Sequence, residues 1–283
     1  MEFWLALIFM NIINRRSEKS PYAPVRIARV FTGPHAKGNP CAVKQHRFAP
    51  SQISALNPSD YTQCLSWPKA EGVVVQCWTP SGKAIDCCGH GLLATAALWL
   101  QESSIVRYES PITLYMNGSQ IECNMKSQDL ELYFEKVDST QCELPAWLDQ
   151  FFPIKPIRSA IVGGDTGYLV LEWPENFQLK SLPTPSKCLE QVTKRALIVT
   201  SLQSTSWQLS KPPQIQLRYF APQYGVDEDS ATGSAMRVLA GYWQRRESFD
   251  TLNAYQCSIE GGVLHSHIKN QKVRVSGLVE WLS

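Results

Sequence analysis

The sequence has no run of basic residues and no zinc-finger spacing, and both absences argue against a nucleic-acid-binding protein. Its 27 basic and 25 acidic residues leave a formal net charge of only +2. Charged residues make up 18% of the chain and apolar residues 44%, which is a globular rather than a disordered composition. With 283 residues, the chain is long for a single core and long enough for two domains.

No CxxC pair occurs among the nine cysteines, so neither a zinc site nor any other metal site is expected. The cysteines are odd in number and irregularly spaced, and adjacent Cys87 and Cys88 are poor partners for an ordinary structural disulfide. This usage favours reduced thiols in a reducing compartment, and therefore a cytoplasmic protein.

The apolar stretch near the start of the chain, Phe3–Ile13, is too short to span a bilayer, and no membrane partner is expected. A signal peptide carries its positive charge before the apolar run, whereas Arg15 and Arg16 follow it here. Residues 1–23 are therefore interpreted as an N-terminal extension, such as a packed arm, rather than as a targeting segment.

Strand-like segments rich in β-branched and aromatic residues dominate the remaining chain. They are Val25–Phe31, Gly72–Thr79, Ser159–Ile161, Tyr168–Trp173, Ala196–Thr200 and Gln214–Phe220. Two pairs of shorter segments predict hairpins: Ile121–Met125 with Leu130–Phe134, and His265–Ile268 with Val273–Val275.

Two long helices carry a strong signal, Gly91–Gln101 and Gly233–Arg245. The first is apolar almost all round, which indicates a helix buried on every side, as when a sheet wraps around it. Shorter helices are expected near Pro50–Leu56 and Leu144–Phe151.

An internal repeat relates two stretches of the sequence. CWTP (77–80) is followed after seven residues by CGHG (88–91) and an apolar helix, and YFAP (219–222) is followed after seven residues by SATG (230–233) and a second apolar helix. In each copy a strand ends at proline and a small residue begins a helix, whose free N–H groups and dipole favour an anion. A pseudo-two-fold relation would bring both helix starts to one cleft between the halves, where small molecules usually bind.

The first loop combines a thiol, Cys88, with an imidazole, His90. A thiol at a helix N-terminus has a lowered pKa, and an imidazole moves protons near neutral pH. The second loop places three acids before Ser230, including Asp229. The structural alternatives remain open here: Cys88 as a buried apolar residue, His90 as a core histidine, and the acidic loop as a helix cap.

Four motifs resemble the phenazine-biosynthesis PhzF-like family, which shares its fold with diaminopimelate epimerase. They are VFT (30–32) with GNPCAV (38–43), WTP (78–80) with CGH (88–90), RYFAP (218–222) with EDSATGSA (228–235), and QCS (256–258) with GG (261–262). The motifs extend over most of the chain, whereas its middle is only loosely similar.

The resemblance implies an α+β fold of two pseudo-symmetric halves, each a curled mixed β-sheet wrapped around a central α-helix. We expect the halves at 24–137 and 138–283, with the last strand able to return to the first half. The resemblance also implies chemistry without a cofactor or metal, and a homodimer.

Site residues follow from the resemblance position by position. The family's active-site histidine, aspartate and serine match His90, Asp229 and Ser234. Substrate binding is expected at the two helix starts, that is at Cys88, Gly89, Gly91, Ser230, Thr232 and Gly233.

The family's catalytic glutamate is replaced. Its best match is Asp60, within the stretch Asn57–Cys64, and Glu71 is a second candidate carboxylate. A carboxylate one methylene shorter would lie roughly 1 Å away, which matters for proton transfer. Ser230 also replaces the family's usual proline.

The main hypothesis is a cofactor-independent isomerase that moves a proton on a small anionic metabolite, with Asp60 as the base and with His90 and Asp229 binding and polarising the substrate. In epimerases of the same fold, the positions of Cys88 and Ser230 hold the paired thiols, so a Cys88-based epimerase is one alternative. The other is an altered family member that binds a metabolite or a protein partner without turnover.

Overall fold

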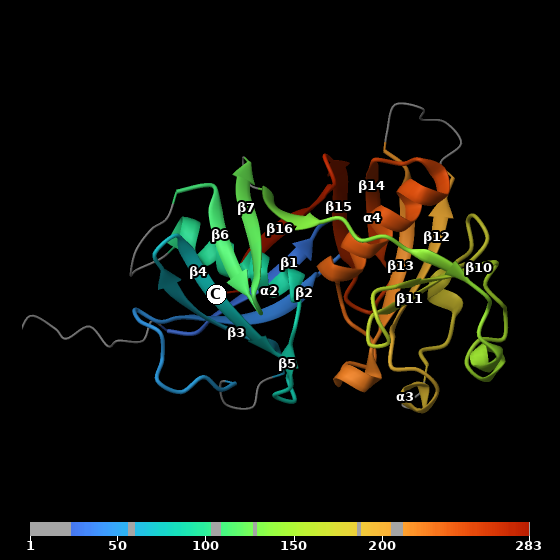
Figure 1. Ribbon diagram of the computed structural model, residues 1–283, viewed down its shortest axis with the longest axis horizontal. Helices are drawn as coiled ribbons and strands as arrows, with labels where there is room; N and C mark the ends of the chain where they lie inside the picture. The colour runs from blue at the N-terminus through green and yellow to red at the C-terminus, as the bar shows by residue number, and fades with distance from the viewer. Residues whose placement is uncertain are drawn as a thin grey trace, which may run out of the picture.

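A computed structural model describes residues 24–55, 60–102, 109–126, 129–185, 188–204 and 212–282. The described chain is an α+β structure in which one continuous mixed sheet supplies both halves (Figure 1). The hydrogen-bonded strand order is β1-β2-β3-β4-β6-β7-β8-β16-β15-β14-β13-β12-β11-β10-β9, with β5 paired to β4.

The strands of the first half, followed by β16, are β1 (Arg26–Thr32), β2 (Asn39–Gln45), β3 (Thr62–Lys69), β4 (Gly72–Trp78), β5 (Ala84–Ile85), β6 (Ile112–Met116), β7 (Ser119–Lys126), β8 (Asp129–Glu135) and β16 (Lys272–Leu282). Strand β16 pairs with β8 on one side and with β1 on the other, so the sheet closes on itself. Helix α2 (Gly89–Ala97) lies inside this closed sheet, and every one of its residues is buried.

The strands of the second half are β9 (Thr140–Cys142), β10 (Arg158–Val162), β11 (Tyr168–Glu172), β12 (Ala196–Gln203), β13 (Gln214–Phe220), β14 (Thr251–Gln256) and β15 (Gly262–Lys269). This part of the sheet curls around helix α4 (Gly233–Glu247), which packs on β14, β15 and β16. The short helical segments of the chain are η1 (Leu98–Glu102), η2 (Ala146–Gln150), η3 (Leu179–Ser181), α3 (Leu189–Val192) and η4 (Pro222–Tyr224).

The predicted fold class is confirmed, and both long helices form where the sequence places them. The first helix begins two residues earlier than predicted and ends in the π-helical turn η1, where side chains such as Trp99 are fully buried. The predicted strands and both hairpins are present, although the turn at 127–128 lies outside the described residues.

Two helix predictions were wrong in detail. The chain forms no helix over 50–55, where it is largely exposed and buries no apolar stripe. Leu56 lies outside the described residues. The helix expected at Leu144–Phe151 is the short 3₁₀ turn η2, which contributes only Leu148 to the buried side chains.

The N-terminal extension 1–23 also lies outside the described residues. In the part of the chain that the structure describes, none of the helices has the length and apolar character needed to cross a membrane.

Candidate active site

Helices α2 and α4 meet end to end where the two halves join. A Cβ atom added to Gly89 would lie only 2.8 Å from the Cα atom of Gly233, and one added to Gly233 would lie 3.1 Å from the Cα atom of Gly89. Neither helix start has a side-chain cap. The N–H groups of both first turns therefore lack partners within their helices and converge on one place.

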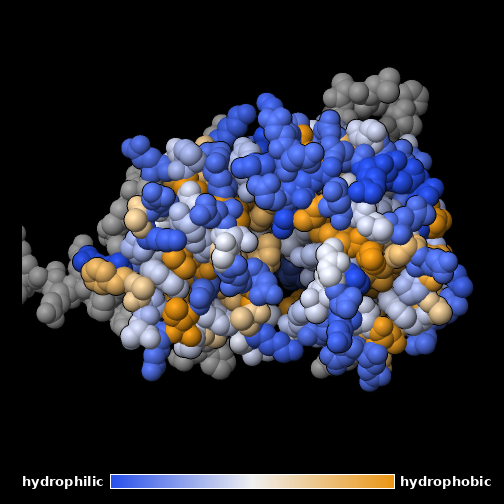
Figure 2. Space-filling model, viewed as in Figure 1, coloured by the Kyte–Doolittle hydropathy of each residue, from blue (hydrophilic) through white to orange (hydrophobic). Residues whose placement is uncertain are grey.

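A cavity of about 400 Å³ opens at this junction, and the face seen in Figure 2 is hollowed between the two halves. Its wall includes Gly89 and His90 from α2 and Gly233 and Ser234 from α4. The second half adds three tyrosines to the wall: Tyr168, Tyr219 and Tyr224. The cavity is therefore built by both halves, and its wall combines helix starts, ionisable groups and aromatic rings.

His90 is 6% exposed and lies between a thiol and an amide. Its Nδ1 atom is 3.8 Å from Cys88 Sγ and 3.4 Å from Asn39 Nδ2. The Asn39 side chain continues the contact to the second half, because its Nδ2 group donates to Asp229 Oδ1 at 2.7 Å. Asn39 thus contacts both the histidine of one helix start and the aspartate that precedes the other.

Asp229 is half-buried, and both of its carboxylate oxygens accept hydrogen bonds. Thr232 Oγ1 donates to Asp229 Oδ2 at 2.6 Å, opposite the bond from Asn39. The Gln256 Nε2 group donates to the Asp229 backbone oxygen at 2.7 Å and to Thr232 Oγ1 at 3.0 Å, and its Oε1 atom accepts from the Thr232 N–H at 2.8 Å. The carboxylate is thereby fixed in orientation before any substrate arrives.

Burial and charge shift the pKa values of these groups. Burial by itself would lower the pKa of His90, but the adjacent Cys88 thiolate and the Asp229 carboxylate outweigh it and raise the pKa to about 10. Burial raises the pKa of Asp229, although the His90 charge and the bonds from Thr232 and Asn39 oppose the rise. Hydrogen bonds from Cys64 and Cys77 and the charge of His90 hold the pKa of Cys88 well below its usual value, against burial.

Most of the residues predicted for the site meet in this wall. Cys88, Gly89, His90, Asp229, Thr232, Gly233 and Ser234 all line the cavity. Ser230 and Gly91 do not line it. The Ser230 backbone oxygen accepts a hydrogen bond from Ser258 Oγ, and Gly91 faces the interior of the first half.

The two candidate carboxylates of the first half are not brought to the cavity. Asp60 is exposed and does not line it, although Thr62, two residues further along, does. Residues 57–59 of the predicted glutamate-like stretch lie outside the described residues. Glu71 is exposed in the turn between β3 and β4.

Several wall and supporting residues were missed from the sequence. Asn39 and Gln256 each lie within a quoted motif, GNPCAV and QCS, so those motifs could have pointed to them. The three tyrosines come from a strand, a strand end and a short helical turn, and no local pattern distinguishes them from core or surface residues.

Comparison with known proteins identifies the kind of protein that this fold and site define. The structure of a PhzF-family protein from Enterococcus faecalis superposes with a TM-score of 0.76 at 22% identity, over 93% of this chain and 97% of that one. The sequence profile of the phenazine biosynthesis-like protein family matches residues 69–279.

Curated relatives agree with this profile. An uncharacterized isomerase of Halalkalibacterium halodurans is 30% identical over 261 residues, which is 90% of this chain and 94% of the relative. An uncharacterized isomerase of Vibrio cholerae serotype O1 is 28% identical over 246 residues, 84% of this chain and 81% of the relative. The chain belongs to the phenazine biosynthesis-like family, and the names of its relatives support an isomerase-type enzyme.

Proposed function

We propose that this chain is a cofactor-independent isomerase that moves a proton between two positions of one small anionic substrate. The observation that carries the proposal is that His90 and Asp229, which both contact Asn39, lie in the wall of one cavity at the meeting point of two uncapped helix starts. An acid, a base and an anion-binding place are thus within reach of the same small molecule.

The helix starts bind the substrate's negative charge. The first-turn N–H groups at Gly89 and Gly233 are free of intrahelical partners, and both helix dipoles favour an anion there. The three tyrosines of the cavity wall offer an apolar surface for the rest of the molecule, which favours a carboxylate attached to a flat or unsaturated body.

The proton transfer is assigned to Asp229 and His90. The Asp229 carboxylate takes the proton from a carbon of the substrate, and the electron pair of that C–H bond moves into the substrate's unsaturated system. The His90 imidazolium stabilises the charge that develops and delivers a proton at the second carbon. No electron leaves the substrate, and proton exchange with water returns Asp229 to the carboxylate and His90 to the imidazolium, so the cycle balances without a redox partner.

This assignment differs from the sequence-based hypothesis, in which Asp60 is the base. Asp60 is exposed and outside the cavity wall, whereas Asp229 is held within it by Asn39 and Thr232. The small anionic substrate, the homodimer and the cytoplasmic location remain predictions.

Solvent exchange tests the proposal. The protein is incubated in D₂O with a panel of small unsaturated and cyclic carboxylates and amino acids, and deuterium incorporation is followed by NMR. We expect incorporation together with a shifted double bond for at least one compound, with loss of the signal in Asp229→Asn and His90→Gln and its retention in Asp60→Ala. If deuterium incorporation were retained in Asp229→Asn and lost in Asp60→Ala, the base would be Asp60 rather than Asp229.

A Cys88-based epimerase is the second candidate, because Cys88 lines the cavity beside His90. An epimerase of this kind needs a second acid-base group facing the first, and Ser230, the matching position, does not line the cavity. Deuterium incorporation with inverted configuration and an unmoved double bond, abolished by Cys88→Ser, would favour the epimerase. Binding of a panel compound without any exchange would favour the non-catalytic alternative.

A further inference from the structure

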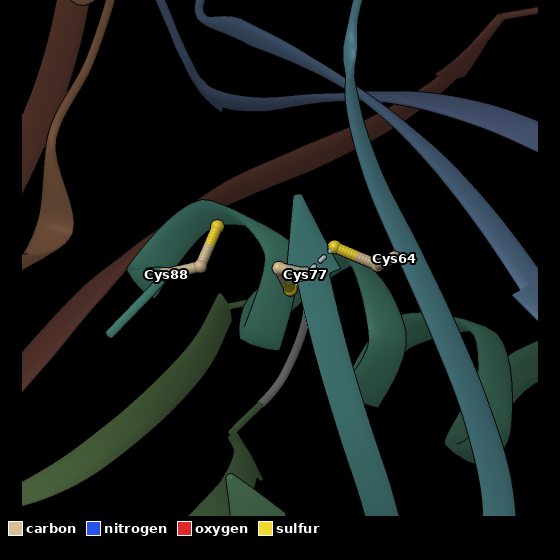
Figure 3. Close-up of side chains that lie close together, drawn as sticks. All are labelled: Cys64, Cys77 and Cys88. Carbon is tan, nitrogen blue, oxygen red and sulfur yellow. Dashed lines mark hydrogen bonds between the residues drawn. The ribbon is translucent and has the colours of Figure 1, made fainter. Parts of the chain in front are cut away.

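Three cysteines far apart in the sequence meet inside the closed sheet of the first half. The Sγ atoms of Cys64, Cys77 and Cys88 all lie within 4.8 Å of one another, and we refer to these three residues as the thiol cluster. Figure 3 shows Cys64 and Cys77 on neighbouring strands and Cys88 at the start of helix α2. We propose that the thiol cluster binds one thiophilic metal ion, of the Zn²⁺ or Cu⁺ class.

The strand pairing places two of the three proposed ligands side by side. Cys64 of β3 and Cys77 of β4 are direct partners in an antiparallel pair, and their Sγ atoms are 2.7 Å apart. Metal–sulfur bonds of about 2.3 Å would separate two sulfurs by roughly 3.8 Å, so binding needs this pair to open by about 1 Å. Rotation about the Cα–Cβ bonds supplies that movement without a change in the strands.

Gly91 of α2 packs directly against the three sulfurs. A Cβ atom added there would lie 2.4 Å from Cys64 Sγ, 2.8 Å from Cys88 Sγ and 2.9 Å from Cys77 Sγ. The point next to the Gly91 Cα is therefore close to all three ligand atoms at once. Any side chain at position 91 would therefore displace the three sulfurs from their present positions.

The burial of the three sulfurs and their chemistry suit a soft cation. Cys64 is 0% exposed and Cys77 and Cys88 are each 3% exposed, so water does not compete for the site. Sulfur ligands without carboxylates select Zn²⁺ or Cu⁺ over Mg²⁺ or Ca²⁺.

A fourth ligand is available for the ion that needs one. Cys41 of β2 is buried, and its Sγ atom is 3.4 Å from Cys64 Sγ. Zn²⁺ in closed sites takes four ligands and would recruit Cys41, whereas Cu⁺ accepts three thiolates. The two ions thus predict different effects of removing Cys41.

The proposed reaction uses His90 and Asp229 and needs no metal, but Cys88 of the thiol cluster also lines the active-site cavity beside His90. The sequence analysis expected no metal site because no CxxC pair occurs. The thiol cluster is formed by residues of two strands and a helix start, so no short metal-binding motif in the sequence indicates it.

Metal titration of the reduced full-length protein tests the proposal. Co²⁺ replaces Zn²⁺ as a spectroscopic probe, and Cu⁺ is supplied anaerobically from a chelator complex. We expect one ion per chain, a thiolate-to-metal charge-transfer band, and displacement of Co²⁺ by Zn²⁺. Affinity should fall by more than about 10-fold in Cys77→Ser, since even the loss of an outer partner costs that much at metal sites.

Matched variants separate the site from general thiol binding and from misfolding. Cys123→Ser removes another buried thiol of the same half and should leave the titration unchanged. Gly91→Ala removes no ligand, and should weaken binding because its methyl group displaces the three sulfurs. Cys41→Ser should weaken Zn²⁺ and Co²⁺ but leave Cu⁺ unchanged. Circular dichroism establishes that each variant is folded.

Three results would overturn the proposal. The first is the lack of a thiolate band with both ions in the folded wild-type protein. The second is an unchanged band in Cys77→Ser or in Cys64→Ser. The third is a Cys64–Cys77 disulfide, found by mass spectrometry, that forms again after reduction in preference to metal binding.

Discussion

Gly89 and Gly233 touch backbone to backbone at the centre of the molecule, with 2.8 Å between an added Cβ on Gly89 and the Gly233 Cα atom. This contact places the first turns of α2 and α4 against one cavity. Each residue is the first of its helix, so the contact sets the distance between the two anion-binding helix starts. The geometry of the site therefore depends on two residues without side chains.

Substitution of Gly89 by alanine should separate the helix starts. The added methyl group meets backbone atoms, which cannot rotate away, so we expect Gly89→Ala to destabilise the fold by about 1–3 kcal/mol. Urea unfolding measures the loss. Gly164→Ala is the control, because nothing lies within 4 Å of an added Cβ there. Equal stability of the two variants would contradict the close contact.

Removal of the Asn39 amide should affect both stability and catalysis. Asn39 Nδ2 donates to Asp229 Oδ1 at 2.7 Å and to the Ala231 oxygen at 2.9 Å, and Asn39→Ala leaves both acceptors without this donor. We expect a loss of about 1–3 kcal/mol in unfolding free energy and a lower kcat. Asn39→Asp should be worse than Asn39→Ala, because it adds a negative charge beside Asp229. The opposite order would show that the amide does not serve the carboxylate.

The loop before Asp229 is held by a buried ion pair. Arg218 Nε lies 2.7 Å from Glu228 Oε1 and Arg218 Nη2 lies 2.8 Å from Glu228 Oε2, and both side chains are largely buried. Because Arg218→Met leaves the Glu228 charge buried and unpaired, we expect it to cost about 3 kcal/mol or more in thermal or urea unfolding. Asp165→Asn removes a fully exposed partner of Arg195 and should have no measurable effect.

Replacement of the two candidate bases should separate their roles. Asp229→Asn keeps the shape of the side chain but removes its ability to accept a proton, and we expect exchange into substrate to fall by about 10²–10⁴-fold. Asp60→Ala, in an exposed position outside the cavity, should change the rate little. Deuterium exchange rates measured with both variants on one substrate decide between the two carboxylates.

Much of the fold can be predicted from the sequence because its signals are local. The all-apolar stretch of α2 indicates a helix buried on every side, and all of its residues are buried. The repeated strand, proline and small-residue pattern indicates two helix starts at one cleft, and Gly89 and Gly233 are in contact there. His90 and Asp229 stand next to these starts, so a motif could place them near the site.

Which residues far apart in the chain contact one another could be established only from the tertiary structure. The bond from Asn39 to Asp229 and the thiol cluster join segments that no periodicity connects. For Asp60 the sequence was misleading. Its position in a stretch that resembles a family motif suggested a catalytic base, whereas in the structure it is exposed and outside the cavity. Local preferences determine helices, strands and their ends, because they act within a few residues. Which side chains meet is decided by how the sheet curls and closes, because that closure brings distant strands into register.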